Sequence, residues 1–199
     1  MTAGSFQAAV VGCSAGGLEA LHRLLDPLPA DFPLPLVVVA HLSANSDSLL
    51  PQLLQGKCRL KVLEAEDKMP VVAGSVYVGP PGYHLLVEAD HTLSLSVDEK
   101  VCHVRPAIDV LFRSAADVWG DGLVAILLTG ANRDGTAGLR AVKQRGGLCL
   151  VQDPATAVAE TMPRSAIAAG LADQVLPLDE ISRSLQRIAP SRAKKGKLE

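Results

Sequence analysis

The chain has 199 residues, of which 48% are hydrophobic and 20% charged. This balance is typical of one folded domain and excludes a disordered chain or a multi-domain assembly. With 19 Lys and Arg against 21 Asp and Glu, the charge argues against a protein that coats nucleic acid or an anionic membrane. No apolar run reaches the ~18 residues of a membrane span. Residues 1–7 lack the basic segment of a secretory signal, so we expect a cytoplasmic protein without direct membrane insertion.

The first part of the chain alternates apolar strands with segments of helical period. A strand is predicted at 8–12, and leucines then recur at helical spacing as far as Leu28. A second strand at 36–40 is continuously apolar, as expected when helices cover both faces of a parallel sheet. The pattern next predicts a helix at 48–55 and a strand at 60–64. Each of these segments has the length of an element in a β-α-β protein.

The segment 75–97 has a different pattern, in which two alternating runs flank a Gly-Pro-Pro-Gly turn and an acidic turn. This pattern indicates antiparallel ribbons. Pro106 then opens a helix, and the strongest strand of the chain is predicted at 123–128. The remaining elements are a helix at 138–145, a strand at 148–152, a helix at 163–169, a strand at 174–176 and a last helix around 181–188.

The order of these elements predicts an α/β fold: a doubly wound, mostly parallel sheet with an antiparallel β-ribbon insertion. We expect residues 1–190 to form one domain and residues 191–199 to be a disordered polar tail. The four cysteines are far apart and form no C-x-x-C pair, so we expect reduced thiols rather than a zinc site or disulfides. The five histidines show no metal-ligand spacing, and no metal is expected.

Three polar residues lie in the segments that follow predicted strands, where parallel sheets bind their ligands. Ser14 lies in a G-x-S-x-G turn, His41 ends the second strand, and Asp134 follows the strongest strand. A serine nucleophile needs a base, and the base needs an orienting carboxylate. Each residue also has a structural interpretation: a helix cap for Ser14, a core hydrogen bond for His41 and a turn for Asp134. The order Ser, His, Asp differs from the Ser, Asp, His of α/β-hydrolases.

Six blocks of the chain show a pattern that extends beyond these three residues: VVGCSAGGLEAL, VVVAHLS, EAEDKMPVVAGSVYVGPPGYHLLV, HVRPAIDVLFRSAA, LLTGANRDGTAGLRAVKQRGG and VQDPATAVAETMPRSAIAAG. In this order the chain resembles the catalytic domain of the chemotaxis receptor methylesterases, the CheB-type protein-glutamate methylesterases. The resemblance implies a methylesterase catalytic domain over residues 1–190. It also implies that Ser14 is the nucleophile, His41 the base and Asp134 the orienting acid.

The resemblance also bears on the surroundings of the serine. Backbone N–H groups near Ala15 and Ala131 are expected to stabilise the oxyanion. The family pattern usually has other residues at these two positions and at Ala40 and Ser43. None of these departures replaces Ser14, His41 or Asp134.

A basic rim is expected to help docking to the acidic surroundings of receptor methylation sites. Arg133, Arg105 and Arg164 are the candidates, with solvated surface arginines as the alternative interpretation. His84 is either a cleft-lining, substrate-binding residue or a hydrogen-bonding residue of the ribbon. Asp109 is expected to form an exposed pair with the arginine four residues later on the same helix.

The resemblance implies hydrolysis of γ-glutamyl methyl esters on the cytoplasmic helices of methyl-accepting chemoreceptors, yielding glutamate and methanol without a cofactor. The same chemistry can deamidate glutamine. Members of the family often carry an N-terminal receiver domain, and only thirteen residues precede Ser14. We therefore expect no receiver domain in this chain, which leaves a separate regulatory protein as a partner.

Other functional interpretations remain open at this point. One is a catalytically idle docking module of a signalling complex, and another is an unrelated small-molecule esterase. Nucleotide binding at residues 12–17 is weaker, because the third glycine of the G-x-G-x-x-G pattern is missing.

Overall fold

The centre of the molecule is a sheet whose three central strands are buried along their whole length. We describe residues 6–41 and 48–189 of the computed structural model. Within them the sheet contains β1 (Ala8–Cys13), β2 (Leu36–Ala40), β3 (Lys61–Glu64), β4 (Ser75–Val78), β7 (Leu123–Leu127), β8 (Leu148–Gln152) and β9 (Gln174–Leu176). The seven strands are ordered β3-β4-β2-β1-β7-β8-β9, and every neighbouring pair is parallel. The pairing Val10↔Val37 and Val10↔Ala125 places β1 at the centre.

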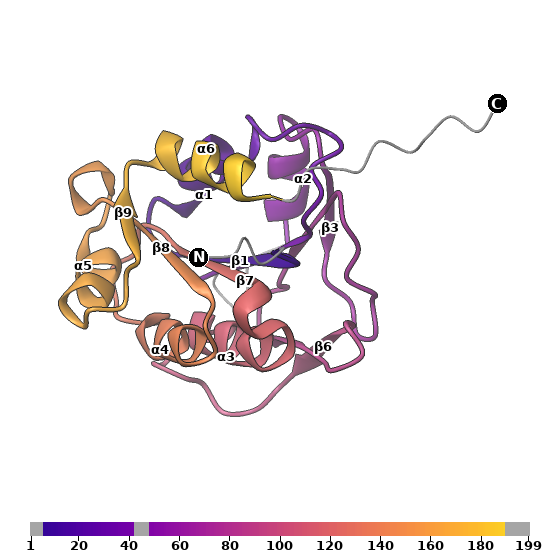
Figure 1. Cartoon of the computed structure of the whole chain (residues 1–199). Coiled ribbons are helices and arrows are strands. Elements are labelled where there is room, and N and C mark those ends of the chain that lie inside the picture. Colours follow the sequence, from indigo (N-terminus) through magenta and orange to yellow (C-terminus); the bar gives the residue numbers. More distant parts are fainter. Residues whose placement is uncertain (1–5, 42–47, 190–199) are drawn as a thin grey trace.

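Helices cover both faces of this sheet (Figure 1). They are α1 (Gly17–Leu25), α2 (Leu50–Gln55), α3 (Ile108–Trp119), α4 (Thr136–Gln144), α5 (Thr161–Ala168) and α6 (Leu178–Ile188). One buried apolar cluster joins α1, α2 and α6 to one face, and a second joins α3, α4 and α5 to the other. Successive side chains of β1 alternate between the two clusters, which explains why the whole strand is apolar. The prediction of a doubly wound, mostly parallel α/β fold is confirmed.

The antiparallel insertion is also present, but it is shorter than the sequence suggested. β5 (His84–Val87) and β6 (Leu93–Ser96) form a two-stranded antiparallel ribbon. The expected ribbon strand at 75–78 is instead β4, which lies between β2 and β3 and is parallel to both. Its polar alternation is misleading because Ser75 and Tyr77 are both buried. The Tyr77 hydroxyl donates to the Pro70 carbonyl and accepts the Val72 N–H, so a polar atom is accommodated inside the core.

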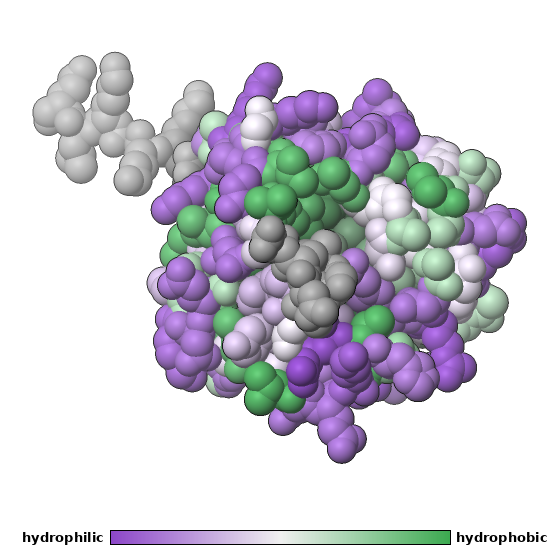
Figure 2. All heavy atoms as spheres, turned by 180° about the vertical axis from the view of Figure 1, so that it is seen from behind, coloured by the Kyte–Doolittle hydropathy of each residue, from purple (hydrophilic) through white to green (hydrophobic). Residues whose placement is uncertain are grey.

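The face of the molecule in Figure 2 carries polar side chains with several groups of apolar side chains among them. None of the helices in the described ranges has the length and hydrophobicity needed to cross a bilayer. The segment 190–199, which contains the expected disordered tail, lies outside the described residues, and so does Ser43.

Candidate active site

The three candidate residues lie at the carboxyl edge of the sheet, at the ends of its three central strands. Ser14 follows β1, His41 follows β2, and Asp134 lies in the loop between β7 and α4. Backbone hydrogen bonds tie these strand ends together. The His41 N–H donates to the Cys13 carbonyl at 3.1 Å, and the Ser14 N–H donates to the Thr129 carbonyl at 2.9 Å. The parallel arrangement thus gathers residues that are far apart in the chain.

The turn after Ser14 depends on a glycine in the left-handed region. Gly16 has φ 78° and is the residue from which α1 begins. A Cβ built on Gly16 would lie 2.5 Å from the Cβ of Val158, closer than real Cβ contacts come. The chain can therefore reverse direction here, leaving Ser14 partly exposed at the start of a helix.

Replacing Gly16 with alanine is expected to lower the free energy of unfolding by about 2–4 kcal/mol, because backbone strain and a clash with Val158 add. Gly170→Ala is the matched control, since Gly170 has φ 68° and nothing within 4 Å of an added Cβ. Gly170→Ala should lower the free energy of unfolding through backbone strain alone, by about 1–2 kcal/mol. Urea unfolding measures both variants. Equal losses would show that the contact with Val158 is not restrictive.

His41 and Asp134 form a close pair across the site. His41 Nε2 lies 2.8 Å from Asp134 Oδ2, across 93 residues of sequence. The side chains are 9% and 0% exposed, respectively. This pair has the geometry of a base held by an orienting carboxylate. Among the described residues, the Ser14 hydroxyl makes no hydrogen bond to the imidazole in this structure. Hydrogen bonds between nucleophile and base are often long or absent before substrate binds.

Asp134 is fixed by backbone donors as well as by His41. The N–H groups of Ile108 and Asp109, at the start of α3, donate to its two carboxylate oxygens at 2.7 and 3.0 Å. The Gly135 N–H adds a third bond at 2.9 Å. Helix N-termini present such free N–H groups and favour negative charge. The start of α3 thus holds Asp134 as an anion.

The pKa of Asp134 lies below its ordinary value of 3.8. Burial by itself would raise this pKa, but the hydrogen bonds from His41, Asp109 and Ile108 outweigh burial. The carboxylate therefore stays ionised at neutral pH. An ionised carboxylate is the form that orients an imidazole and offsets its charge when it is protonated.

Asp109 was expected on an exposed face, and this expectation is wrong. It is only 4% exposed, and its carboxylate accepts the Gly138 N–H at 2.7 Å. Gly138 brings α4 so close to α3 that a Cβ there would lie 2.5 Å from that of Phe112. Burial, together with the neighbouring charge of Asp134, raises the pKa of Asp109. The i, i+4 spacing alone could not reveal this close helix contact.

Cys13, directly before Ser14, is fully buried. Burial raises the pKa of its thiol to about 12. A thiol with so high a pKa is protonated at neutral pH and is a poor nucleophile. The chemistry of the turn therefore depends on Ser14.

The two expected oxyanion donors lie close to this turn. Ala15 and Ala131 are both exposed, and within the described segments neither backbone N–H donates to another backbone carbonyl. The Thr129 hydroxyl donates to the Ala15 carbonyl at 2.8 Å, which links the loop after β7 to the serine turn. The N–H of Ser14 itself is already occupied by Thr129.

Two of the three candidate rim arginines are engaged within the chain. Arg164 pairs with Glu160 one turn earlier on an exposed helix face, at 2.9 Å. Arg105 donates to the backbone carbonyls of Val97 and Asp98. Arg133 is exposed, and it lies beside the Cys102 thiol and next in sequence to Asp134.

The structure favours the second interpretation of His84, hydrogen bonding inside the fold. The residue is 1% exposed. Its Nδ1 accepts the Ala107 N–H at 3.2 Å, and its Nε2 lies 3.0 Å from the Glu99 carbonyl. Both ring nitrogens are thus used, and neither is free to bind substrate.

Sequence reasoning did not identify Asn132, which lies between the strand end and Asp134. Its Oδ1 accepts the Asp134 N–H at 3.1 Å, and its Nδ2 lies 3.4 Å from His41 Nδ1. Asn and Asp residues favour turns in which the side chain bonds the backbone two residues further on. The sequence therefore indicated a turn at Asn132, and nothing in it indicated a contact with His41.

A group of possible metal-ligating atoms also occurs here, formed by Cys102, Asp109 and Asp134. Both carboxylates already accept backbone N–H groups, and burial and the two carboxylates raise the pKa of the Cys102 thiol. These bonds favour hydrogen bonding by the two carboxylates over metal ligation.

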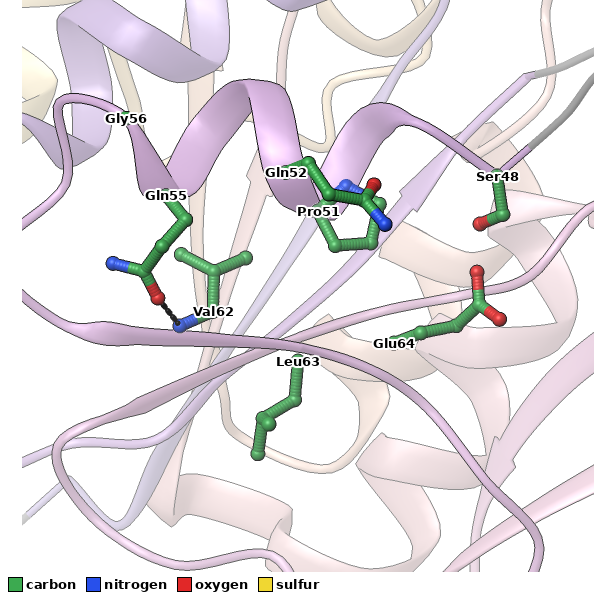
Figure 3. A pocket seen from close by; sticks show the side chains of 8 residues that line it. All are labelled: Ser48, Pro51, Gln52, Gln55, Gly56, Val62, Leu63 and Glu64. Carbon is green, nitrogen blue, oxygen red and sulfur yellow. Dashed lines mark hydrogen bonds between the residues drawn. The ribbon is translucent and has the colours of Figure 1, made fainter.

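A separate hollow of about 560 Å³ lies between α2 and the outer side of β3. Figure 3 shows the Ser48 hydroxyl and the Glu64 carboxylate facing each other at one end of it, with Gln55 bonded to the Val62 N–H at the other. None of the three candidate catalytic residues lines it. The chemistry of the molecule is therefore concentrated at the sheet edge above β1, β2 and β7.

The fold and this site define a class of α/β proteins. Its members carry a histidine–aspartate pair and a serine turn at the carboxyl edge of a parallel sheet, which is the arrangement of a serine hydrolase. The model of one such family, CheB methylesterase, matches residues 9–185. The chain belongs to the CheB methylesterase family. The resemblance in the sequence blocks and the expected enzyme class, a methylesterase, are thereby confirmed.

Individual relatives agree with this assignment. A protein of Leptospira interrogans, provisionally named protein-glutamate methylesterase/protein-glutamine glutaminase, is 47% identical over 184 residues, covering 92% of this chain and 95% of the relative. The protein-glutamate methylesterase/protein-glutamine glutaminase of Symbiobacterium thermophilum is 39% identical over 178 residues, and the match covers 89% of this chain but 49% of that protein. The crystal structure of the Thermotoga maritima CheB methylesterase catalytic domain matches with a TM-score of 0.90 and 36% identity, covering 94% of this chain and all of that one.

Proposed function

We propose that this protein hydrolyses γ-glutamyl methyl esters on the cytoplasmic helices of methyl-accepting chemoreceptors, with Ser14 as the nucleophile. The observation that carries the proposal is the buried His41–Asp134 hydrogen bond beside the Ser14 turn, in a chain of the CheB methylesterase family. The names of the relatives add a glutaminase activity. We therefore include glutamine deamidation at the same site.

In the proposed reaction, the Ser14 hydroxyl oxygen attacks the ester carbonyl as its proton passes to His41. Because His41 Nε2 faces Asp134, the base is Nδ1. The N–H groups of Ala15 and Ala131 stabilise the negative charge on the carbonyl oxygen. The C–O bond then breaks, His41 returns the proton, and methanol leaves. Water, activated by the same nitrogen, hydrolyses the acyl-enzyme to glutamate and free Ser14. No step requires a cofactor.

The test is methanol release from membranes that contain a methylated chemoreceptor, with the unmethylated receptor as blank. The proposal expects release that depends on the protein, and ammonia release from a receptor with glutamine at the same sites. An idle docking module would release neither product, and a serine-directed phosphonate would leave Ser14 unlabelled. A small-molecule esterase would turn over short esters while leaving the receptor methylated. Either pattern would contradict the proposed function.

The proposed substrate places the protein in the cytoplasm and makes receptor recognition partly electrostatic. Among the three candidate rim arginines, Arg133 is exposed and adjoins Asp134 in sequence. A separate regulatory protein remains a proposed partner.

Replacing Arg133 with alanine is expected to raise KM for methylated receptor up to about fivefold at low salt, the range of one exposed charge. At high salt the two KM values should converge, because screening removes the advantage of the arginine. Arg140→Ala, an exposed arginine on α4, is the control and should leave KM unchanged. If the two variants show the same salt dependence, Arg133 has no special part in docking.

A further inference from the structure

The side chain of Asn132 joins the two residues of the buried pair. Its amide oxygen is bound by the Asp134 N–H at 3.1 Å, which decides the orientation of the amide. The amide nitrogen therefore faces the imidazole, 3.4 Å from His41 Nδ1. Reversing the amide would bring two donors together at the Asp134 N–H. Asn132 thus presents a hydrogen-bond donor to Nδ1, while the opposite nitrogen of the ring faces Asp134 Oδ2.

A donor at Nδ1 is compatible with only one state of the ring. When Nε2 carries the proton and bonds Asp134, Nδ1 has a free lone pair that accepts from the amide. When both nitrogens are protonated, Nδ1–H and the amide N–H face each other without an acceptor. We propose that Asn132 is a positioning residue that reinforces the tautomer of His41 with its lone pair on Nδ1 and disfavours protonation of that nitrogen. The inference rests on the proposed function in taking His41 as the base.

This arrangement has a consequence for each half of the reaction. At 3.4 Å the amide is a weak hydrogen-bond donor, so the Ser14 hydroxyl can replace it at Nδ1 when substrate arrives. After proton transfer, the new Nδ1–H finds no acceptor in the amide of Asn132. The proton is then directed toward the methoxide oxygen as the ester bond breaks. Asn132 thereby keeps the proton moving toward the leaving group.

Other charged and titratable groups around the pair act from the Asp134 side. Asp134 faces Nε2, Asp109 lies behind it at the start of α3, and the Cys102 thiol lies close to both carboxylates and to Arg133. None of these groups is altered when Asn132 is replaced. Differences between variants at position 132 therefore report on the Nδ1 side of the ring.

The experiment compares the wild type with Asn132→Ala and Asn132→Asp in the methanol assay between pH 5 and 9. Asn132→Ala removes the donor, and Asn132→Asp substitutes an acceptor that favours protonated Nδ1. We expect the acid limb of kcat/KM to move to higher pH by about half a unit in the first variant and by about one unit in the second. On the limb these shifts lower activity roughly threefold and tenfold, with little change at pH 9 or in KM. Thr136→Ala, whose hydroxyl has no partner in the described part of the chain, is the control.

Imidazole ¹⁵N spectra give a readout that is independent of turnover. The wild type should show His41 protonated on Nε2 alone at pH 8, and in Asn132→Ala the protonation of Nδ1 should begin at higher pH than in the wild type. Coinciding pH profiles, or unchanged Nδ1 protonation in the spectra of Asn132→Ala, would overturn the role of Asn132 even if methanol release and its dependence on Ser14 stand. Loss of that dependence would instead refute the proposed function, and the spectra would still decide the tautomer.

Discussion

Replacing Ser14 with alanine is expected to reduce methanol release by roughly 10⁴-fold or more, the scale seen when a nucleophile is removed from a serine triad. The hydroxyl oxygen is the atom that forms the acyl-enzyme, and no neighbour can replace it. Cys13 is buried with a pKa raised to about 12. The backbone bonds of Ser14 to Thr129 and Gly17 do not involve the hydroxyl, so the melting temperature should stay the same.

Ser165→Ala is the matched control, because the hydroxyl of this partly buried serine on α5 donates to the Thr161 carbonyl of its own helix. It should retain full methanol release. The comparison needs the quenched methanol assay together with thermal unfolding of both variants. If Ser14→Ala keeps more than a tenth of wild-type activity, the proposed covalent mechanism is wrong.

Replacing Asp134 with asparagine is expected to affect both activity and stability. Activity should fall by about 10⁴-fold, because an amide no longer holds the imidazole in the required tautomer. If the amide oxygen accepts from Asp109 and Gly135, the amide nitrogen faces the Ile108 N–H and His41 Nε2, which are both donors in the wild type. Unsatisfied buried donors cost about 1–3 kcal/mol. We therefore expect the free energy of unfolding at pH 7 to fall by about 2–3 kcal/mol.

Asp109→Asn provides a close control, since this neighbouring carboxylate is also buried. Burial raises the pKa of Asp109, so its ionisation opposes folding at neutral pH. The amide oxygen of the variant can still accept the Gly138 N–H. We expect the free energy of unfolding to change by less than about 1 kcal/mol and methanol release to persist. Denaturant unfolding of both variants at pH 7 gives the comparison, and equal losses would contradict the special role of Asp134.

The pKa values of Asp134 and Asp109 should also depart from their ordinary value in opposite directions. Because the pKa of Asp134 lies below 3.8 in the folded state, its stabilising contribution is fully present above the unfolded-state pKa. That contribution is lost as the pH falls through the lower folded-state value. The contribution of Asp109 has the opposite sign, because its pKa is raised. Carboxyl ¹³C shifts of the folded protein measure both values directly.

The sequence alone determined the alternation of strands and helices and the three positions where polar residues follow strands. Strands buried on both faces must be apolar throughout, and a polar residue directly after one is therefore conspicuous. Since the carboxyl ends of parallel strands meet at one edge, the order of residues along the chain is enough to assign Ser14, His41 and Asp134 to the same region.

The tertiary structure decided what depends on contacts between distant segments. β4 lies in the parallel sheet, and the Tyr77 hydroxyl has its partners in the loop 70–72. Asp109 is buried because α3 and α4 meet at Gly138. Asn132 faces His41 across 91 residues. Such hydrogen bonds follow from packing geometry, and no periodicity or spacing in one segment encodes the partner that another segment supplies.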